Sequence, residues 1–208
     1  MNRIRTFAIT LSLLLATTTA GPAWADGSGG LLVGAKVGAG FGQVMSPFGT
    51  AFIPELEVGY ALPMGLAFTV SAQYAAPTTT GTAPKDARLP GSGVMSYTLT
   101  QNQLILSLAA MYRLDVGSKT FRPYAAIGPR LYLMRTDIVA SGGGQDYGKN
   151  AETSTQVGVL VEAGTEIALG PGALTAELQL GYASVDQTVL QKTSVGSLNV
   201  VVGYRVMF

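Results

Sequence analysis

The 208-residue sequence contains no cysteine and no histidine. Without these residues it cannot build a Ser-His or Cys-His catalytic centre, a zinc finger, a haem or iron–sulfur site, or a disulfide. The formal net charge is only +1, which provides no basic field to hold nucleic acid. We therefore expect no cofactor and no nucleic-acid partner.

Charge of either sign is scarce. Charged residues make up 12% of the chain and hydrophobic residues 48%, whereas a typical soluble domain carries roughly 25% charged residues. Beyond the N-terminal segment, no stretch is apolar for the 18 residues or so that a membrane-spanning helix needs. An exported chain with too little charge for water and no such helix is typical of a closed β-barrel in an outer membrane.

Residues 1–25 predict a secretory signal peptide. Arg3 and Arg5 precede an apolar stretch, which is shorter than the ~20 residues of a transmembrane anchor, the alternative interpretation. The small-x-small motif formed by Ala23 and Ala25 around Trp24 predicts cleavage before Asp26. We expect a short linker at 26–30 and a single barrel domain at 31–208.

Eight later segments alternate between apolar and polar residues with the period of a β-strand. They are 31–42, 52–62, 66–75, 95–114, 120–134, 156–168, 173–183 and 197–208. Short turns near 63–65, 115–119 and 170–172 alternate with longer connections near 43–51, 76–94, 135–155 and 184–196. This order predicts an all-β fold, a closed antiparallel up-and-down transmembrane barrel of eight strands with both termini in the periplasm. Ten strands are the alternative if segment 76–94 or 135–155 contains a hairpin.

Two segments depart from a simple pattern. In 95–114 the outward face changes from leucines to Ser96, Thr98, Thr100 and Asn102. This change predicts a strand that projects above the membrane into water, with a β-bulge as the alternative. Segment 120–134 contains Pro123 and Pro129, which weaken its assignment because proline interrupts a ladder of hydrogen bonds.

The charged residues of the predicted strands fall on the inward face, although the faces are assigned from apolar residues alone. A cation on the lipid face would cost roughly 2–4 kcal/mol at mid-membrane. Arg135 has the outward phase, but we place it in the headgroup region, where its strand leaves the membrane. A soluble barrel of lipocalin type is the competing fold, and the low charge disfavours it. The ten inward charges are Lys36, Glu55, Glu57, Arg113, Arg122, Arg130, Glu162, Glu166, Glu177 and Arg205.

The interior of an eight-stranded barrel is just wide enough to be filled by side chains. Buried ions must pair there, so we expect a salt-bridge network that plugs the lumen, with Lys36 paired to Glu55 or Glu57 and Arg205 paired to Glu177. The alternative is a gate whose pairs exchange to admit ions. The paired carboxylates suggest acid–base catalysis, but the lumen is too narrow for a sugar and holds as many cations. No catalytic motif occurs, so we do not expect an enzyme.

The chain ends on Phe208, five residues after Gly203, and Tyr204 and Val206 lie between them. This ending resembles the C-terminal signal of bacterial outer-membrane barrels, which implies recognition by the barrel-assembly machinery. Across 31–208 the pattern resembles the small eight-stranded outer-membrane proteins of the OmpA/OmpX type, without the peptidoglycan-binding domain of OmpA-like proteins.

That resemblance implies a structural protein, an adhesin, a narrow pore or, rarely, a lipid-modifying enzyme. The enzymes of this class rely on a histidine, which this sequence lacks. We expect a monomer in outer-membrane lipid that serves as an envelope structural or surface-interaction protein. A narrow gated channel for small solutes or ions is the alternative.

Overall fold

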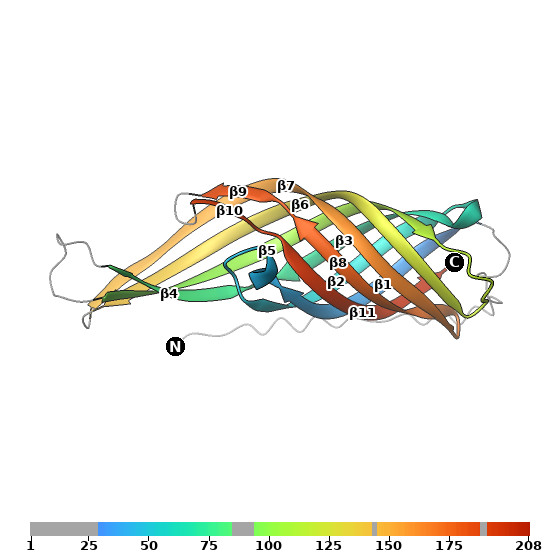
Figure 1. The fold of residues 1–208 in the computed structure, drawn as a ribbon, viewed down its shortest axis with the longest axis horizontal. Helices are drawn as coiled ribbons and strands as arrows, with labels where there is room; N and C mark the ends of the chain where they lie inside the picture. The colour runs from blue at the N-terminus through green and yellow to red at the C-terminus, as the bar shows by residue number, and fades with distance from the viewer. Residues whose placement is uncertain (1–28, 85–93, 143–144, 188–190) are drawn as a thin grey trace, which may run out of the picture.

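The computed structural model describes residues 29–84, 94–142, 145–187 and 191–208. The predicted signal peptide and its cleavage site lie outside these ranges. The described residues form an elongated barrel of tilted antiparallel strands (Figure 1). None of the helices in the described ranges is long and apolar enough to cross a bilayer.

Eight strands form the barrel wall, and each pairs with its neighbour in an antiparallel ladder. They are β1 (Gly30–Phe41), β2 (Thr50–Ala61), β3 (Leu66–Ala75), β5 (Val94–Arg113), β6 (Phe121–Gly142), β7 (Gln145–Leu169), β8 (Gly172–Tyr182) and β11 (Ser197–Met207). The barrel closes where β1 pairs with β11. At this seam Leu31 and Phe208 exchange backbone hydrogen bonds of 3.0 and 2.9 Å. The predicted closed, eight-stranded, all-β fold is confirmed.

The longer connections contain more strand than the sequence predicted. Segment 135–155 is not a loop, because β6 and β7 remain paired as far as Gly142 and Gln145. Segment 184–196 contains a short hairpin of β9 (Ser184–Gln187) and β10 (Gln191–Ser194). Both regions are rich in small polar residues, which pair well through their backbones but show no apolar alternation.

Segment 76–94 contains β4 (Thr78–Pro84), which adds no ninth strand to the wall. Both β3 and β4 pair with β5 in one unbroken register, Leu66 opposite Tyr112 and Thr78 opposite Thr100. β4 therefore continues β3 after a two-residue interruption that contains Pro77. The ten-strand alternative is wrong for the described residues.

The polarity change in β5 does not come from a bulge in that strand. β5 keeps one register with β6 from Ser96 to Arg113, and the outward phase of Ser96 and Thr98 continues that of the leucines below. The irregularity lies instead in the β6–β7 ladder, whose register shifts between Val139 and Ser141.

Both prolines of segment 120–134 lie inside β6. The ladder with β5 lapses beside Pro129, which has no N–H to donate. The neighbouring Gly128 allows a close approach of the strands, since a β-carbon there would overlap the carbonyl oxygen of Leu108. The strand therefore accommodates both prolines at the cost of a local gap in its ladder.

Burial alternates along the wall as the sequence predicted. In β8, for example, Thr175, Glu177 and Gln179 are buried and Leu174, Leu178 and Leu180 are exposed on the outer face. The wall is therefore apolar outside and polar inside, which is the arrangement of a barrel surrounded by lipid.

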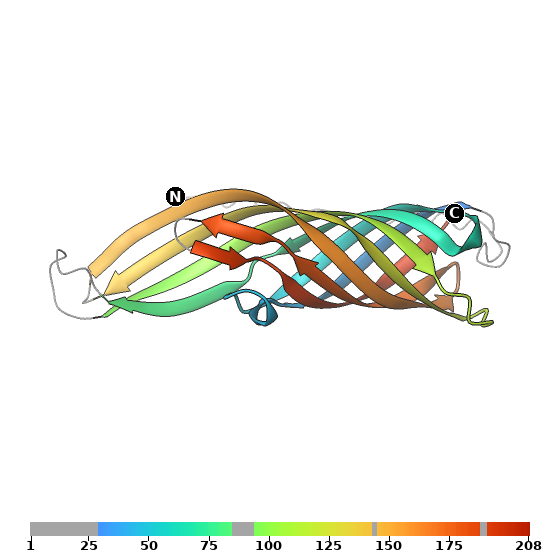
Figure 2. The same ribbon diagram turned by 45° about the horizontal axis from the view of Figure 1, so that its top comes forward.

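The wall strands project to different distances at one end of the barrel. β5, β6 and β7 run well beyond the other wall strands, and β4 accompanies them (Figures 1 and 2). We call this part of the sheet, residues 78–84, 94–102, 134–142 and 145–156, the extension. The short turns and the C-terminus lie at the opposite end (Figure 1), which is the periplasmic end in barrels of this type.

Candidate functional site

The ten predicted lumen charges come from seven of the eight wall strands, and β3 contributes none. Nine of the ten are buried in the structure, and Arg122 is half-buried. They face one another because successive strands all direct their polar phase inward.

Lys36 on β1 is the centre of the network. Its Nζ donates to Glu55 Oε1 at 3.1 Å and to Glu57 Oε2 at 2.7 Å, both on β2. It also lies 2.7 Å from Glu177 Oε1 on β8. An ammonium group has three N–H donors, so three carboxylates use its whole capacity.

A glycine on the adjacent strand makes room for Lys36. Gly203 on β11 lies directly opposite Lys36 in the ladder, and a β-carbon there would approach Lys36 Cγ to 2.6 Å. Tyr124 similarly lies against Gly164, its ladder partner on β7. The inward glycines thus provide the space that the large lumen side chains occupy.

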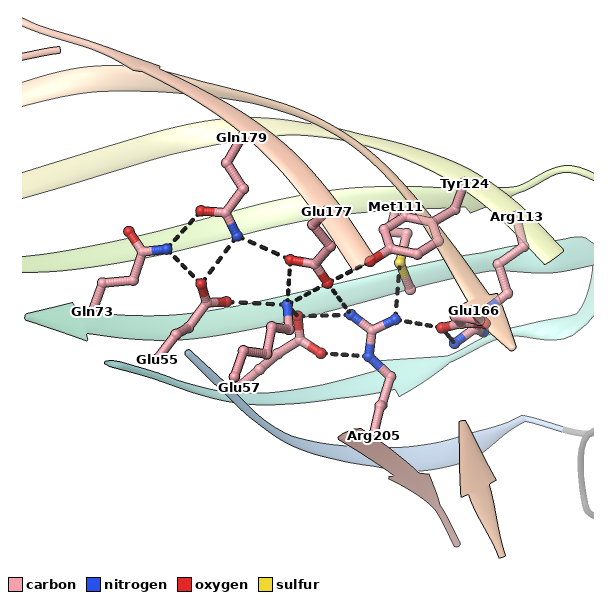
Figure 3. A network of polar contacts seen from close by, with 11 residues as sticks. Glu55, Glu57, Gln73, Met111, Arg113, Tyr124, Glu166, Glu177, Gln179 and Arg205 are labelled. Atoms are coloured by element: carbon pink, nitrogen blue, oxygen red, sulfur yellow. Dashed lines mark hydrogen bonds and ion pairs between the residues drawn. The ribbon is translucent and has the colours of Figure 1, made fainter. Parts of the chain in front are cut away.

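Arg205 on β11 connects Glu57 and Glu177 to a further carboxylate, Glu166 (Figure 3). Its guanidinium binds Glu57 in bidentate fashion, with Nε to Oε1 at 2.6 Å and Nη2 to Oε2 at 3.0 Å. Nη1 donates to Glu166, and Nη2 lies 3.4 Å from Glu177 Oε1. Glu166 in turn accepts from Arg113 Nε at 2.8 Å. Glu57 therefore bridges both main cations.

Neutral side chains complete the network, with Gln73 and Gln179 on the side away from Arg113 (Figure 3). Gln179 Nε2 donates to Glu55 Oε2 and to Glu177 Oε2, each at 3.0 Å. Gln73 Nε2 donates to Gln179 Oε1 at 2.6 Å and also to Glu55. The Tyr124 hydroxyl donates to Glu177, and its ring lies 5.3 Å from Arg205 Cζ. These contacts fill carboxylate lone pairs that the cations leave open.

Three predicted members lie at the margin of this cluster. Arg130 is buried, but its Nε donates to Ser107 Oγ at 2.9 Å and its Nη2 lies 3.4 Å from Gln179 Oε1. Glu162 is buried beside Gln179 in the β7–β8 register and is not among the carboxylates within ion-pair distance of Lys36 or Arg205. Arg122 lies opposite Glu166 in the β6–β7 ladder.

Some partners were not evident from the sequence. Lys36 contacts both Glu55 and Glu57, and the strongest partner of Arg205 is Glu57 rather than Glu177. The inward phase of Gln73, Tyr124 and Gln179 could have indicated lumen positions for these three residues. Their contacts with the ions depend on which strands face one another across the lumen, which alternation within one strand does not define.

The rest of the interior contains two buried apolar clusters and further buried polar side chains, among them Gln101, Gln103 and Asn199. One buried cluster includes Leu32, Met111, Leu160 and Met207, and a second, farther from the short turns, includes Ile105, Tyr132, Met134, Val185 and Val195. Toward the end of the barrel that carries the extension, a cavity of about 20 Å³ lies between Ile53, Gln103 and Ser197. This volume is roughly enough for one water molecule. Within the described residues, no cluster of side chains is suited to hold a metal ion.

Solved structures share this fold at low sequence identity. A major outer-membrane protein from Thermus thermophilus matches with a TM-score of 0.55 and 15% identity, covering 86% of this chain and 99% of that one. OprG from Pseudomonas aeruginosa matches with a TM-score of 0.54 and 11% identity over 88% and 97% of the two chains. Neisserial surface protein A matches at 0.46 and 22% over 88% and 98%. These likenesses concern the fold.

A search of curated proteins finds no match. The family model described as "Outer membrane protein beta-barrel domain" matches residues 11–205. This range covers every member of the lumen network and the whole wall except the last two residues of β11. The chain therefore belongs to the family of outer-membrane β-barrel proteins, which are embedded in the bacterial outer membrane.

Proposed function

We propose that the protein is a non-enzymatic envelope barrel whose lumen is plugged by ion pairs and whose role is structural or surface-interacting. In this proposal the barrel is a monomer that sits in outer-membrane lipid. The barrel-assembly machinery inserts it by recognising the C-terminal segment from Gly203 to Phe208. The extension is the part of the barrel that reaches other surfaces.

The observation that carries this proposal is the saturation of Lys36. Its Nζ has three carboxylate neighbours at 2.7–3.1 Å, and the side chains of all four residues are at most 3% exposed. A hydrated pathway would place water among these groups. Breaking such a pair by removing one partner costs about 3–5 kcal/mol, so the closed arrangement resists opening.

The extension supports the surface-interaction part of the proposal. Its strands carry the sheet far past the barrel rim (Figure 2), and from Gln145 to Gly158 no described strand pairs with the free edge of β7. Exposed strand edges and loops held on a rigid barrel are common sites of recognition. A plugged barrel that holds such a sheet away from the membrane suits contact with other molecules better than transport.

The second candidate is a narrow gated channel, and Arg130 is the observation that favours it. Within the described residues, this buried guanidinium donates to Ser107 and Gln179 rather than to a carboxylate. Gln179 also contacts Glu55 and Glu177. A shift of Arg130 toward these acids would release part of the charge that holds Lys36, which is the exchange that a gate requires.

Conductance in planar bilayers separates the two candidates. The full-length mature protein should give no stable unitary steps if the network is a plug, and Lys36→Met should create leak currents because it removes the central cation. Lys119→Met, which changes an exposed lysine beside a short turn, is the matched control and should stay silent. Stable steps in the wild type that disappear in Lys36→Met would contradict the plug and establish the channel.

A second experiment tests the surface role. Replacing residues 138–150 by Asn-Gly joins Asp137 to Ala151, which are ladder partners, so the rest of the register is kept. We expect cells that carry this shortened barrel to lose binding to host or neighbouring cell surfaces while the barrel itself remains folded. If cells with the full-length barrel and cells with the shortened barrel both bound these surfaces no better than cells without the protein, the extension would have no role in interaction.

A further inference from the structure

Two grooves adjoin on the outer face of the wall. The upper groove has a volume of about 480 Å³ and crosses β3, β5, β6 and β7. The lower groove has a volume of about 440 Å³ and crosses β11, β1, β2, β3 and β5. Tyr74 and Leu104 line both, so the two grooves form one continuous depression.

The upper groove lies where the outer face changes from apolar to polar. Leu104, Leu133 and Thr155 are neighbours across β5, β6 and β7. One step toward the short turns the outward residues are Leu106, Leu131 and Val157, and one step toward the extension they are Asn102, Arg135 and Thr153. This boundary is the level at which lipid headgroups meet a barrel.

Positive charge is in excess at the polar side of the upper groove, where Arg135 belongs to the lining and Asp137 and Lys149 follow beyond it. Asp137 Oδ1 lies 3.4 Å from Arg135 Nε and 3.6 Å from Lys149 Nζ, so two cations share one carboxylate. Their side chains are 61% and 63% exposed, which leaves most of their donors available. Asn102 Nδ2 donates to Asp137 Oδ2 at 3.3 Å, and the Tyr74 hydroxyl donates to Asn102 at 2.8 Å. These bonds hold the acid in place while the cations face outward.

The lower groove is apolar and descends from the same point. Its outward lining includes Ala35, Leu56, Ala72 and Val202. Ala35, Leu56 and Ala72 lie side by side on β1, β2 and β3. The small alanine side chains on either side of Leu56 give the groove its depth. A groove of this shape, embedded in the hydrocarbon, suits an acyl chain.

We propose that the joined grooves bind a phosphorylated lipid of the outer leaflet. Arg135 and Lys149 hold its phosphate, and one of its acyl chains lies along Leu104 into the lower groove. An arginine and a lysine bind phosphate oxygens by charge-assisted hydrogen bonds, and Asp137 neutralises only one of the two charges. The adjoining apolar groove selects a lipid over free phosphate. This site is independent of the lumen network.

Native mass spectrometry of the full-length mature barrel, titrated with bis-phosphorylated lipid A, tests the site. Arg135→Gln combined with Lys149→Gln should weaken binding by at least on the order of tenfold, since each change removes a charge-assisted contact. The control Lys119→Gln removes an exposed lysine near the opposite end and should bind as the wild type does. Both variants should keep the heat-modifiable gel shift of a folded barrel, because the altered groups are exposed.

A second set of variants tests the acyl-chain part of the site by filling the lower groove with a larger side chain. Ala72→Phe should lower lipid binding severalfold, whereas Ala163→Phe, on the outer face of β7 and away from both grooves, should not. Equal binding of lipid A by the wild type and the double variant would overturn the site. Equal binding of dephosphorylated lipid A would overturn the role of the phosphate. Inorganic phosphate that binds alone, with the same dependence on Arg135, would overturn the lipid assignment.

Discussion

Glu57 inside the barrel and Asp137 on the extension each lie between two cations. Glu57 lies 2.7 Å from Lys36 and 2.6 Å from Arg205, and the side chains of both cations are 0% exposed. Asp137 lies 3.4 Å from Arg135 and 3.6 Å from Lys149, whose side chains are more than half exposed. The same charge pattern therefore occurs in a sealed interior and in contact with solvent.

This difference shows that ion pairs contribute strongly to stability where water is excluded. In the lumen, a charge that loses its partner has no solvent to replace it, so each removal is costly. On the extension, water and salt screen the pair, and exposed pairs contribute about 0–1 kcal/mol. The lumen network defines the packing of the barrel interior, whereas the Asp137 pairs leave their cations free for other partners.

The largest expected effect follows from removing the buried carboxylate. Glu57→Gln deprives both Lys36 and Arg205 of an anion and should lower the free energy of unfolding by about 3–5 kcal/mol. Asp137→Asn should lower it by less than about 1 kcal/mol. Urea titration followed by circular dichroism measures both, because the only tryptophan, Trp24, lies in the predicted signal peptide. Similar losses in the two variants would mean that the lumen admits water.

The second comparison concerns the outer face of one strand. Leu106 and Thr98 share the outward phase of β5, but Leu106 belongs to the apolar band and Thr98 to the extension. Leu106→Arg should destabilise the barrel by about 2–4 kcal/mol, because arginine would face the hydrocarbon. Thr98→Arg should change stability by less than about 0.5 kcal/mol. Unfolding in lipid vesicles distinguishes the two, and an equal, small effect would place Leu106 outside the membrane.

The same strand explains how far the sequence could predict the fold. Alternation identified all eight wall strands, because each places apolar side chains on one face and polar ones on the other. The upper parts of β6 and β7 were assigned to a loop, since residues such as Thr153 and Thr155 are outward yet polar. Above the membrane both faces of a strand tolerate polar residues, so the pattern that predicted the lower wall is absent there.

The lumen was predictable by face and in part by contact, since the expected pairs of Lys36 with Glu55 or Glu57 and of Arg205 with Glu177 are present. The inward phase of Lys36, Glu57 and Arg205 followed from their neighbours in sequence. Contacts between strands that are not neighbours, such as that of Arg205 on β11 with Glu166 on β7, depend on the stagger with which the strands close the barrel, and no single strand encodes that stagger. The excess charge around Asp137 was missed for a similar reason, because Lys149 lay in a segment assigned to a loop.

The smallest expected effect comes from comparing two glycine-to-alanine substitutions. One tests the space available in the lumen, and the other tests backbone strain in the extension. A β-carbon at Gly203 would approach Lys36 Cγ to 2.6 Å, whereas nothing lies within 4 Å of one at Gly148, whose φ is +86°. Gly203→Ala should cost about 1–3 kcal/mol through overpacking, and Gly148→Ala about 1 kcal/mol through its left-handed backbone. Because Gly203 also belongs to the predicted assembly signal, the variant should be compared after refolding in detergent and after export in cells. Normal stability in detergent with failed insertion in cells would assign Gly203 to assembly rather than to the packing of Lys36.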